Sequence, residues 1–100
     1  MKTTINEVNG TPVAVLEGEL DTAAAAGTEQ ALQPLFEAGD KNIVIDCAAL
    51  EYISSSGLRI LLSLLKRSRA AGGSVTLRAV NDDILNVFKM TGFINLFNFE

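Results

Sequence analysis

Histidine is absent from this sequence, and cysteine occurs once, as Cys47. Without histidine, the chain has no Ser-His-Asp or Cys-His nucleophile system and no histidine-ligated metal. A single cysteine excludes an intramolecular disulfide and a cysteine metal site, and we expect Cys47 to be buried near the end of a strand. No phosphate-binding sequence of the GxxxxGK[ST] or GxGxxG type occurs. We therefore expect a protein that is not an enzyme and that holds no metal and no cofactor.

Positive charge is also scarce, with 8 Lys and Arg against 12 Asp and Glu and a formal net charge of −4. Nucleic acids and anionic lipids are bound by basic surfaces, so this balance disfavours both as partners. No apolar run approaches the ~20 residues of a membrane span, and the first residues lack the apolar core of a signal peptide. We expect a cytoplasmic protein that does not insert into membranes.

The order of the predicted elements indicates the fold class. Apolar residues make up 48% of the 100 residues, enough for one core, and we expect a single domain over residues 1–100. Strand patterns cover residues 4–8, 12–18, 42–47, 74–80 and 97–99, and helical patterns cover 23–38, the stretch from the serines before Leu58 to Gly72, and 82–91. This β-β-α-β-α-β-α-β order predicts an α/β fold with a mixed sheet of four to five strands flanked by three to four helices.

Several boundaries follow from local chemistry. Asn9-Gly10 is typical of a type I′ hairpin turn between the first two strands. Asp21 and Thr22 are both plausible N-caps for the helix over 23–38, and Pro34 makes one unbroken helix there less favourable.

The central strand, 42–47, is short, apolar and rich in β-branched residues. This pattern predicts a strand covered on both faces, as in a parallel α/β sheet. We expect residues 48–53 to form a connection from that strand to the serines.

The clearest helix carries an apolar stripe at positions i, i+3, i+4 and i+7. The stripe consists of Leu58, Leu61, Leu62 and Leu65, widened by Ile60 and Leu64. We expect Leu61 and Leu62 to lie in the core. In the third helix, capped by Asn81, we expect Phe88 and Met90 to be core residues.

The only site-like feature is the serine cluster Ser54-Ser55-Ser56, which precedes Gly57 at the start of that helix. One interpretation is structural, because a serine hydroxyl can accept a hydrogen bond from an unpaired N–H of the first helical turn. The other is functional, because a phosphate is tolerated at the positive end of a helix dipole. It would add about two negative charges to a surface available to a partner. Both interpretations stay open here.

Three stretches resemble the STAS-domain anti-sigma factor antagonists. Residues 52–58, Tyr-Ile-Ser-Ser-Ser-Gly-Leu, are similar to the switch motif, in which an aromatic and an apolar residue precede Asp, Ser, Ser or Thr, Gly and Leu. Residues 18–21, Gly-Glu-Leu-Asp, match the end of the family's second strand, and residues 88–93, Phe-Lys-Met-Thr-Gly-Phe, the end of its third helix. The resemblance spans almost the whole chain. At one position the chain departs from the family, whose Asp before the phosphorylated serine is Ser54 here.

The resemblance implies a STAS fold and a partner-switching function without catalysis. The unmodified protein would bind an anti-sigma factor, a GHKL-type serine kinase, and so release the sigma factor. The kinase would then phosphorylate Ser55 with its own ATP and end the binding, and a PP2C-like phosphatase would restore it. The free protein would be a monomer. The partner-binding residues that the resemblance implies are Asp21, Thr22, Ser54, Ser55, Ser56, Gly57, Leu58 and Arg59.

Two of these residues also have structural explanations, since Asp21 suits a helix cap and Arg59 suits a solvated helix face. A second function stays open for the whole chain. STAS domains also serve as cytoplasmic subunits of lipid ABC transporters, where they brace an ATPase and need no phosphoacceptor. A neighbouring serine kinase or sigma factor gene would favour the first function, and a permease with an ATPase the second.

Overall fold

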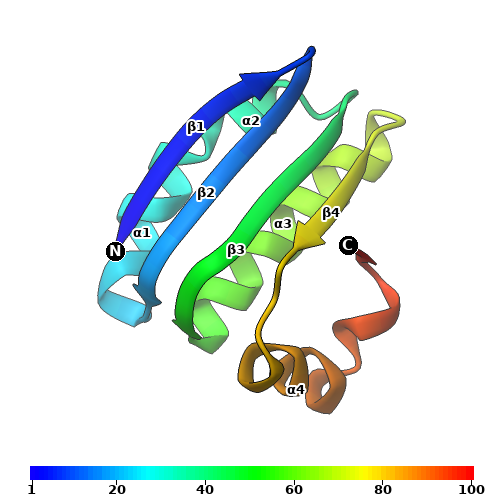
Figure 1. Cartoon of the computed structure of the whole chain (residues 1–100). Helices are drawn as coiled ribbons and strands as arrows, with labels where there is room; N and C mark the ends of the chain where they lie inside the picture. Colours follow the sequence, from blue (N-terminus) through cyan, green and yellow to red (C-terminus); the bar gives the residue numbers. More distant parts are fainter.

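The computed structural model describes residues 1–100, and it contains one mixed sheet of five strands in the order β1-β2-β3-β4-β5 (Figure 1). The elements are β1 (Lys2–Val8), β2 (Thr11–Leu20), α1 (Thr22–Ala31), α2 (Gln33–Glu37), β3 (Asn42–Ile53), α3 (Ser55–Ala70), β4 (Ser74–Arg78), α4 (Asp82–Thr91), the 3-10 helix η1 (Phe93–Asn95) and β5 (Asn98–Phe99). The predicted α/β class and element order are confirmed. None of the helices combines the length and the apolar character needed to cross a membrane.

The sheet pairs β1 antiparallel to β2, and every other neighbouring pair is parallel. Asn9 and Gly10 connect β1 to β2 with φ of 53° and 81°, so the predicted tight turn forms where both residues tolerate positive φ. The parallel strands need crossovers, and the helices supply them.

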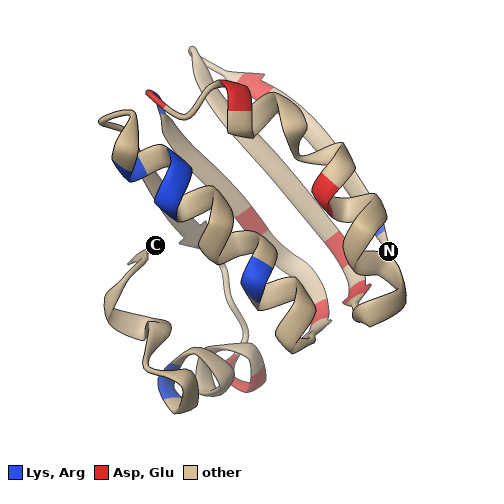
Figure 2. Cartoon of the chain, turned by 180° about the vertical axis from the view of Figure 1, so that it is seen from behind, with Lys and Arg blue, Asp and Glu red and all other residues tan.

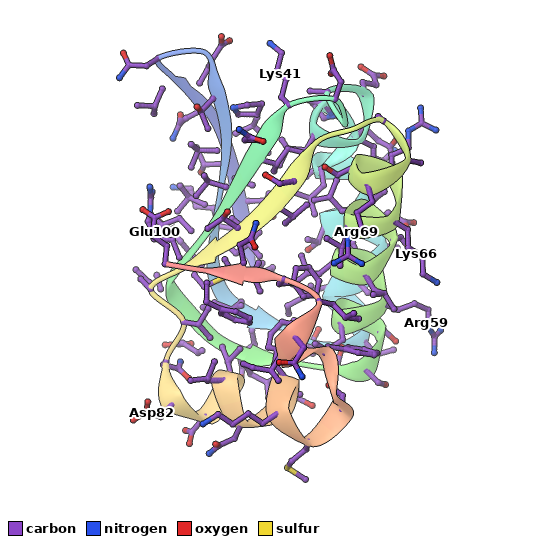
Figure 3. All side chains as sticks on the ribbon, turned by 90° about the vertical axis from the view of Figure 1, so that its right-hand side faces the viewer. Lys41, Arg59, Lys66, Arg69, Asp82 and Glu100 are labelled. Carbon is purple, nitrogen blue, oxygen red and sulfur yellow. The ribbon has the colours of Figure 1, made fainter.

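Helices α1, α2 and α3 lie on one face of the sheet, and no helix lies on the opposite face (Figures 1 and 3). Along β3, Ile43 and Ile45 are fully buried under the helices, whereas Val44 and Asp46, which alternate with them, are half-buried. The prediction that this strand is covered on both faces was therefore wrong. An apolar β-branched run does not reveal how many layers cover a strand.

Strand β3 is also longer than predicted, because residues 48–53 continue it instead of forming a connection. They pair with the end of β2, where Gly18 lies beside Leu50 and, after a further shift of register, Leu20 lies beside Ile53. This stretch, Ala-Ala-Leu-Glu-Tyr-Ile, has no strict apolar-polar alternation, and pairing with a strand distant in sequence keeps it in the sheet.

The predicted helix over 23–38 is divided in two. Helix α1 ends at Ala31, Leu32 serves as its C-cap and as the N-cap of α2, and Pro34 lies in the first turn of α2. Proline is tolerated there because its missing N–H needs no partner in a first turn.

The core contains 21 buried apolar residues, and α3 contributes most of its apolar stripe to it. Leu61 is 1% exposed, as predicted, but Leu62 is only partly buried, so its assignment to the core was wrong. In α4, Phe88 is buried and meets the rings of Phe97 and Phe99 edge to face, at centroid distances of 5.5 and 5.7 Å.

Met90 is 87% exposed, which contradicts the prediction that it is a core residue. It lies two residues after the buried Phe88, about 200° around a helix with 3.6 residues per turn, and so on the side facing away from the core. Cys47 is buried as expected, and burial raises the pKa of its thiol to about 12.

Candidate partner-binding site at the start of α3

The carboxyl ends of β2 and β3 bring the beginnings of two helices together. The strands are parallel, and Leu20 is paired with Ile53 at their ends. Each strand is followed at once by a helix, so α1 and α3 both begin at this edge of the sheet. The backbone N–H of Ser54 donates to the carbonyl oxygen of Leu20 at 2.8 Å, which joins the two connections.

The three serines of the cluster have different roles. Ser54 has extended backbone geometry and is only 7% exposed, and its Oγ accepts a hydrogen bond from the N–H of Gly57 at 3.1 Å. Ser55 is the first residue of α3 and is exposed, and its hydroxyl has no hydrogen-bond partner in the protein. Ser56 is half-buried. The capping role therefore belongs to Ser54, and Ser55 presents a free hydroxyl at the positive end of the helix dipole.

Gly57 allows α3 to approach the end of β2 closely. A Cβ atom at this position would lie 2.7 Å from Cγ of Leu20 and 3.0 Å from Cγ1 of Ile53. Both leucine and isoleucine are buried and cannot move away easily. The glycine of the motif is explained by packing, and it sets the position of the serine cluster relative to β2.

Asp21 is the N-cap of α1, since its Oδ1 accepts a hydrogen bond from the N–H of Ala24 at 2.8 Å. Of the two predicted cap residues, Asp21 is thus the one that acts, and Thr22 is the exposed first residue of the helix. The predicted contact of Asp21 and Thr22 with a partner stays a prediction.

The predicted partner-binding residues differ in exposure. Thr22, Ser55 and Arg59 are exposed, Asp21 and Ser56 are half-buried, and Ser54, Gly57 and Leu58 are buried. The buried residues can serve a partner only by positioning their neighbours. Arg59 forms no ion pair. The one ion pair of the structure joins Arg78 to Asp46 at 3.0 Å on the sheet.

Two shallow hollows flank Arg59. The hollow on the side of α1 has a volume of about 210 Å³ and includes Ser56 and Ser63 in its lining. The hollow on the side of α4 has a volume of about 270 Å³ and includes Ser55 and Phe93. Ser55 and Arg59 therefore belong to a surface that is hollowed on both sides of Arg59.

Sequence reasoning missed the contribution of α4 and of the end of β3 to this region. Thr91 and Phe93 line the second hollow, and the ring of Tyr52, two residues before the cluster, is 49% exposed. The position of Met90 relative to the apolar residues of the helix could have predicted its exposure. No signal in the sequence places the end of α4 beside the start of α3.

The charged groups of this region are divided between α3 and the ends of the strands. No group of three or more His, Cys, Asp or Glu residues is placed to hold a metal ion. Half of the eight basic residues of the chain lie on α3, which carries no acidic residue (Figure 2). The acidic Glu19, Asp21 and Glu51 lie near the strand ends instead.

The fold defines a small α/β domain in which helices cover one face of a mixed five-stranded sheet and an exposed serine without a hydrogen-bond partner begins α3. The chain belongs to the STAS domain family, whose model matches residues 2–100.

Known proteins are similar to this chain in sequence or in fold. BtrV of Bordetella bronchiseptica, which is named as an anti-sigma factor antagonist, is 33% identical over 97 residues, covering 97% of this chain and 84% of BtrV. The anti-sigma-F factor antagonist RsfB of Mycobacterium tuberculosis is 33% identical over 85 residues, covering 78% of this chain and 70% of RsfB. The Bacillus cell fate determinant SpoIIAA in its phosphorylated form superposes with a TM-score of 0.75 at 22% identity, covering 99% of this chain and 91% of that one.

Proposed function

We propose that this protein is a cytoplasmic anti-sigma factor antagonist whose binding is controlled at Ser55. In the unmodified state, the surface around the start of α3 binds an anti-sigma factor of the GHKL serine-kinase type, which then releases its sigma factor. The observation that carries the proposal is the division of roles in the serine cluster. Ser54 caps the helix, so Ser55 is exposed with a hydroxyl that no other group engages.

The chemistry of the switch is a reversible phosphoryl transfer. The kinase moves the γ-phosphoryl group of ATP to Oγ of Ser55, with loss of the hydroxyl proton and release of ADP. A PP2C-like phosphatase hydrolyses the phosphoserine to serine and inorganic phosphate. The protein is the substrate in both steps and contributes no catalytic group.

The position of Ser55 suits a modification that changes binding and leaves the fold intact. A phosphate on the first residue of α3 meets unpaired N–H groups and the positive end of the dipole, which favour an anion. Arg59 follows four residues later on the exposed side of the same helix, at a spacing that favours ion pairs. The names of BtrV and RsfB and the phosphorylated structure of SpoIIAA support the same function.

Ser54 replaces the Asp of the family motif without loss of the helix cap. Its Oγ accepts the hydrogen bond from the N–H of Gly57 that a carboxylate at this position would also accept, because Ser and Asp are both preferred N-caps. The replacement removes a negative charge next to the phosphoacceptor. We therefore propose that the kinase of this protein recognises Ser55 without that carboxylate.

The test compares three variants at Ser55 by calorimetric titration with the purified cognate anti-sigma factor. Ser55→Asp should weaken binding by about a hundredfold, equivalent to about 2.7 kcal/mol. The new carboxylate would have to lose its water at the interface or face a partner group of the same charge, and both are unfavourable. Ser55→Asn introduces a side chain of nearly the same size as aspartate but without the charge, and this variant should bind within a few-fold of wild type. Ser55→Ala should bind normally and resist phosphorylation.

Thermal melts separate binding from folding. Ser55→Asp should melt at or slightly above the wild-type temperature, since a carboxylate near a helix N-terminus contributes about 0.3–1 kcal/mol. Ser54→Ala should melt lower, since loss of an N-cap costs about 0.5–2 kcal/mol. Equal affinity of wild type and Ser55→Asp, with both folded, would refute the switch at Ser55.

A further inference from the structure

The hollow between the start of α3 and the end of α4 combines apolar and polar groups beside the proposed switch. It has a volume of about 270 Å³ and is lined by Ser55, Leu58, Arg59, Leu62, Thr91 and Phe93. Leu62 and Phe93 are only partly buried, although both pack against the core. The apolar stripe of α3 therefore continues into this hollow, where nothing in the protein covers it.

The polar groups of the hollow are arranged asymmetrically. The hydroxyl of Thr91 is engaged by its own helix, where it donates to the carbonyl oxygens of Val87 at 2.9 Å and Phe88 at 3.2 Å. On the α3 side, the hydroxyl of Ser55 and the guanidinium of Arg59 have no hydrogen-bond or ion-pair partner. An incoming group thus meets the apolar side chains of Leu58, Leu62 and Phe93, and beside them on α3 a free cation and a free hydroxyl.

The size of the hollow restricts its occupant. Pockets for drug-sized ligands and cofactors enclose roughly 300–1,000 Å³ and bury most of the ligand. This hollow is smaller than that range and open to solvent, but it can accept a large apolar side chain. Interfaces are commonly held by such anchor side chains in small pockets.

The charge around the hollow indicates which partner fits. Arg59 and Lys66 are seven residues apart on α3 and point away from the body of the protein (Figure 3). No acidic residue interrupts this helix (Figure 2), although the chain as a whole has a net charge of −4. Electrostatic complementarity therefore favours a partner segment that is acidic.

We propose that the hollow receives a large apolar side chain of the anti-sigma factor, while Arg59 pairs with a carboxylate next to that side chain. The inference rests on the proposed function and adds to it the chemistry of the partner segment and the place where it docks. It also explains why a phosphate on Ser55 would end binding, because Ser55 is on the rim of the same hollow. The phosphate would repel the carboxylate of the partner and attract Arg59 away from it.

The experiment uses the purified anti-sigma factor that binds the wild-type protein, in calorimetric titrations at low and moderate salt. Arg59→Glu should weaken binding at least tenfold, and Thr91→Trp, which fills the hollow from an exposed position, should do the same. Lys41→Glu makes the same charge change at the opposite end of the molecule (Figure 3) and should bind within threefold of wild type. Gln33→Trp adds the same ring to an exposed position on α2 and is the control for Thr91→Trp.

Thermal melts of all variants confirm that each is folded, and Thr91→Gln replaces Thr91→Trp if the tryptophan lowers the melting temperature. Binding of Arg59→Glu and the Thr91 variant at wild-type affinity, while Ser55→Asp still binds about a hundredfold more weakly, would overturn the docking site and leave the proposed function intact. Absence of binding by the wild-type protein would instead overturn the proposed function together with the docking site.

Discussion

Gly57→Ala tests whether close packing of α3 against β2 positions the serine cluster. Gly57 is the third residue of α3, and its backbone has ordinary helical geometry with no positive φ. The added methyl group would lie 2.7 Å from Cγ of Leu20 and 3.0 Å from Cγ1 of Ile53. Leu20 is completely buried and Ile53 is 4% exposed, so neither side chain can move into solvent.

Two opposing effects set the magnitude. Alanine is favoured over glycine within a helix by about 0.5–1 kcal/mol. Insertion of a methyl group into a well-packed core costs typically 1–3 kcal/mol. The contact distance of 2.7 Å is too short to be relieved by a small adjustment. We therefore expect a net destabilisation of about 1–2 kcal/mol.

Gly27→Ala is the matched control, because Gly27 lies within α1 and a Cβ there would have no atom within 4 Å. The helix propensity gain is then unopposed, and this variant should be more stable by about 0.5–1 kcal/mol. In a domain of this size, each kcal/mol shifts the melting temperature by about 4–8 °C. The two variants should therefore melt on opposite sides of wild type. A Gly57→Ala variant that melts with or above wild type would refute the packing role of Gly57.

Two further predictions concern the core and the open face of the sheet. Leu61→Ala should cost about 2–5 kcal/mol in urea unfolding, and Leu62→Ala should cost clearly less because this side chain is only partly buried; equal losses would place Leu62 in the core. The backbone N–H of Ala48 and then the guanidinium of Arg78 hold the pKa of Asp46 below its usual value. A lowered pKa in the folded state stabilises the protein above the unfolded-state pKa, and this contribution is lost as pH falls through the folded-state pKa. Asp46→Asn should thus reduce the free energy of unfolding at pH 7 by less than about 1 kcal/mol, since the Asp46–Arg78 pair is partly exposed. It should also reduce the loss of stability as the pH falls below neutral. The same loss of stability at low pH in the variant and in wild type would contradict the lowered pKa of Asp46.

Sequence reasoning succeeded where the deciding interactions are local. Asn9-Gly10 forms its turn, and Asp21 and Asn81 cap their helices, with Oδ1 of each accepting an N–H three residues later. Gly92 ends α4 in the left-handed conformation at φ 79°. These outcomes depend on one residue and its neighbours within a single turn, so the sequence alone contains the information.

The exposure of individual side chains could not be predicted as well. Leu62 continues the apolar stripe of α3 but lies at the edge of the packed layer, beside a hollow. Residues 48–53 lack the apolar pattern of a strand and still extend β3, because β2 offers unpaired backbone groups beside them. In both cases a segment distant in sequence determines the environment.

At the candidate site, too, some features depend on local sequence and others on contacts between segments distant in sequence. The sequence by itself determined that three hydroxyls and a glycine stand at the start of an amphipathic helix, because cap chemistry and helical periodicity are local properties. Only the tertiary structure decided which serine caps the helix and which one is exposed. The hydrogen bond from the N–H of Ser54 to Leu20 holds Ser54 at the end of the strand, so its hydroxyl caps the helix and that of Ser55 faces solvent. The place of α4 beside them was likewise set by packing, which depends on contacts that no short stretch of sequence contains.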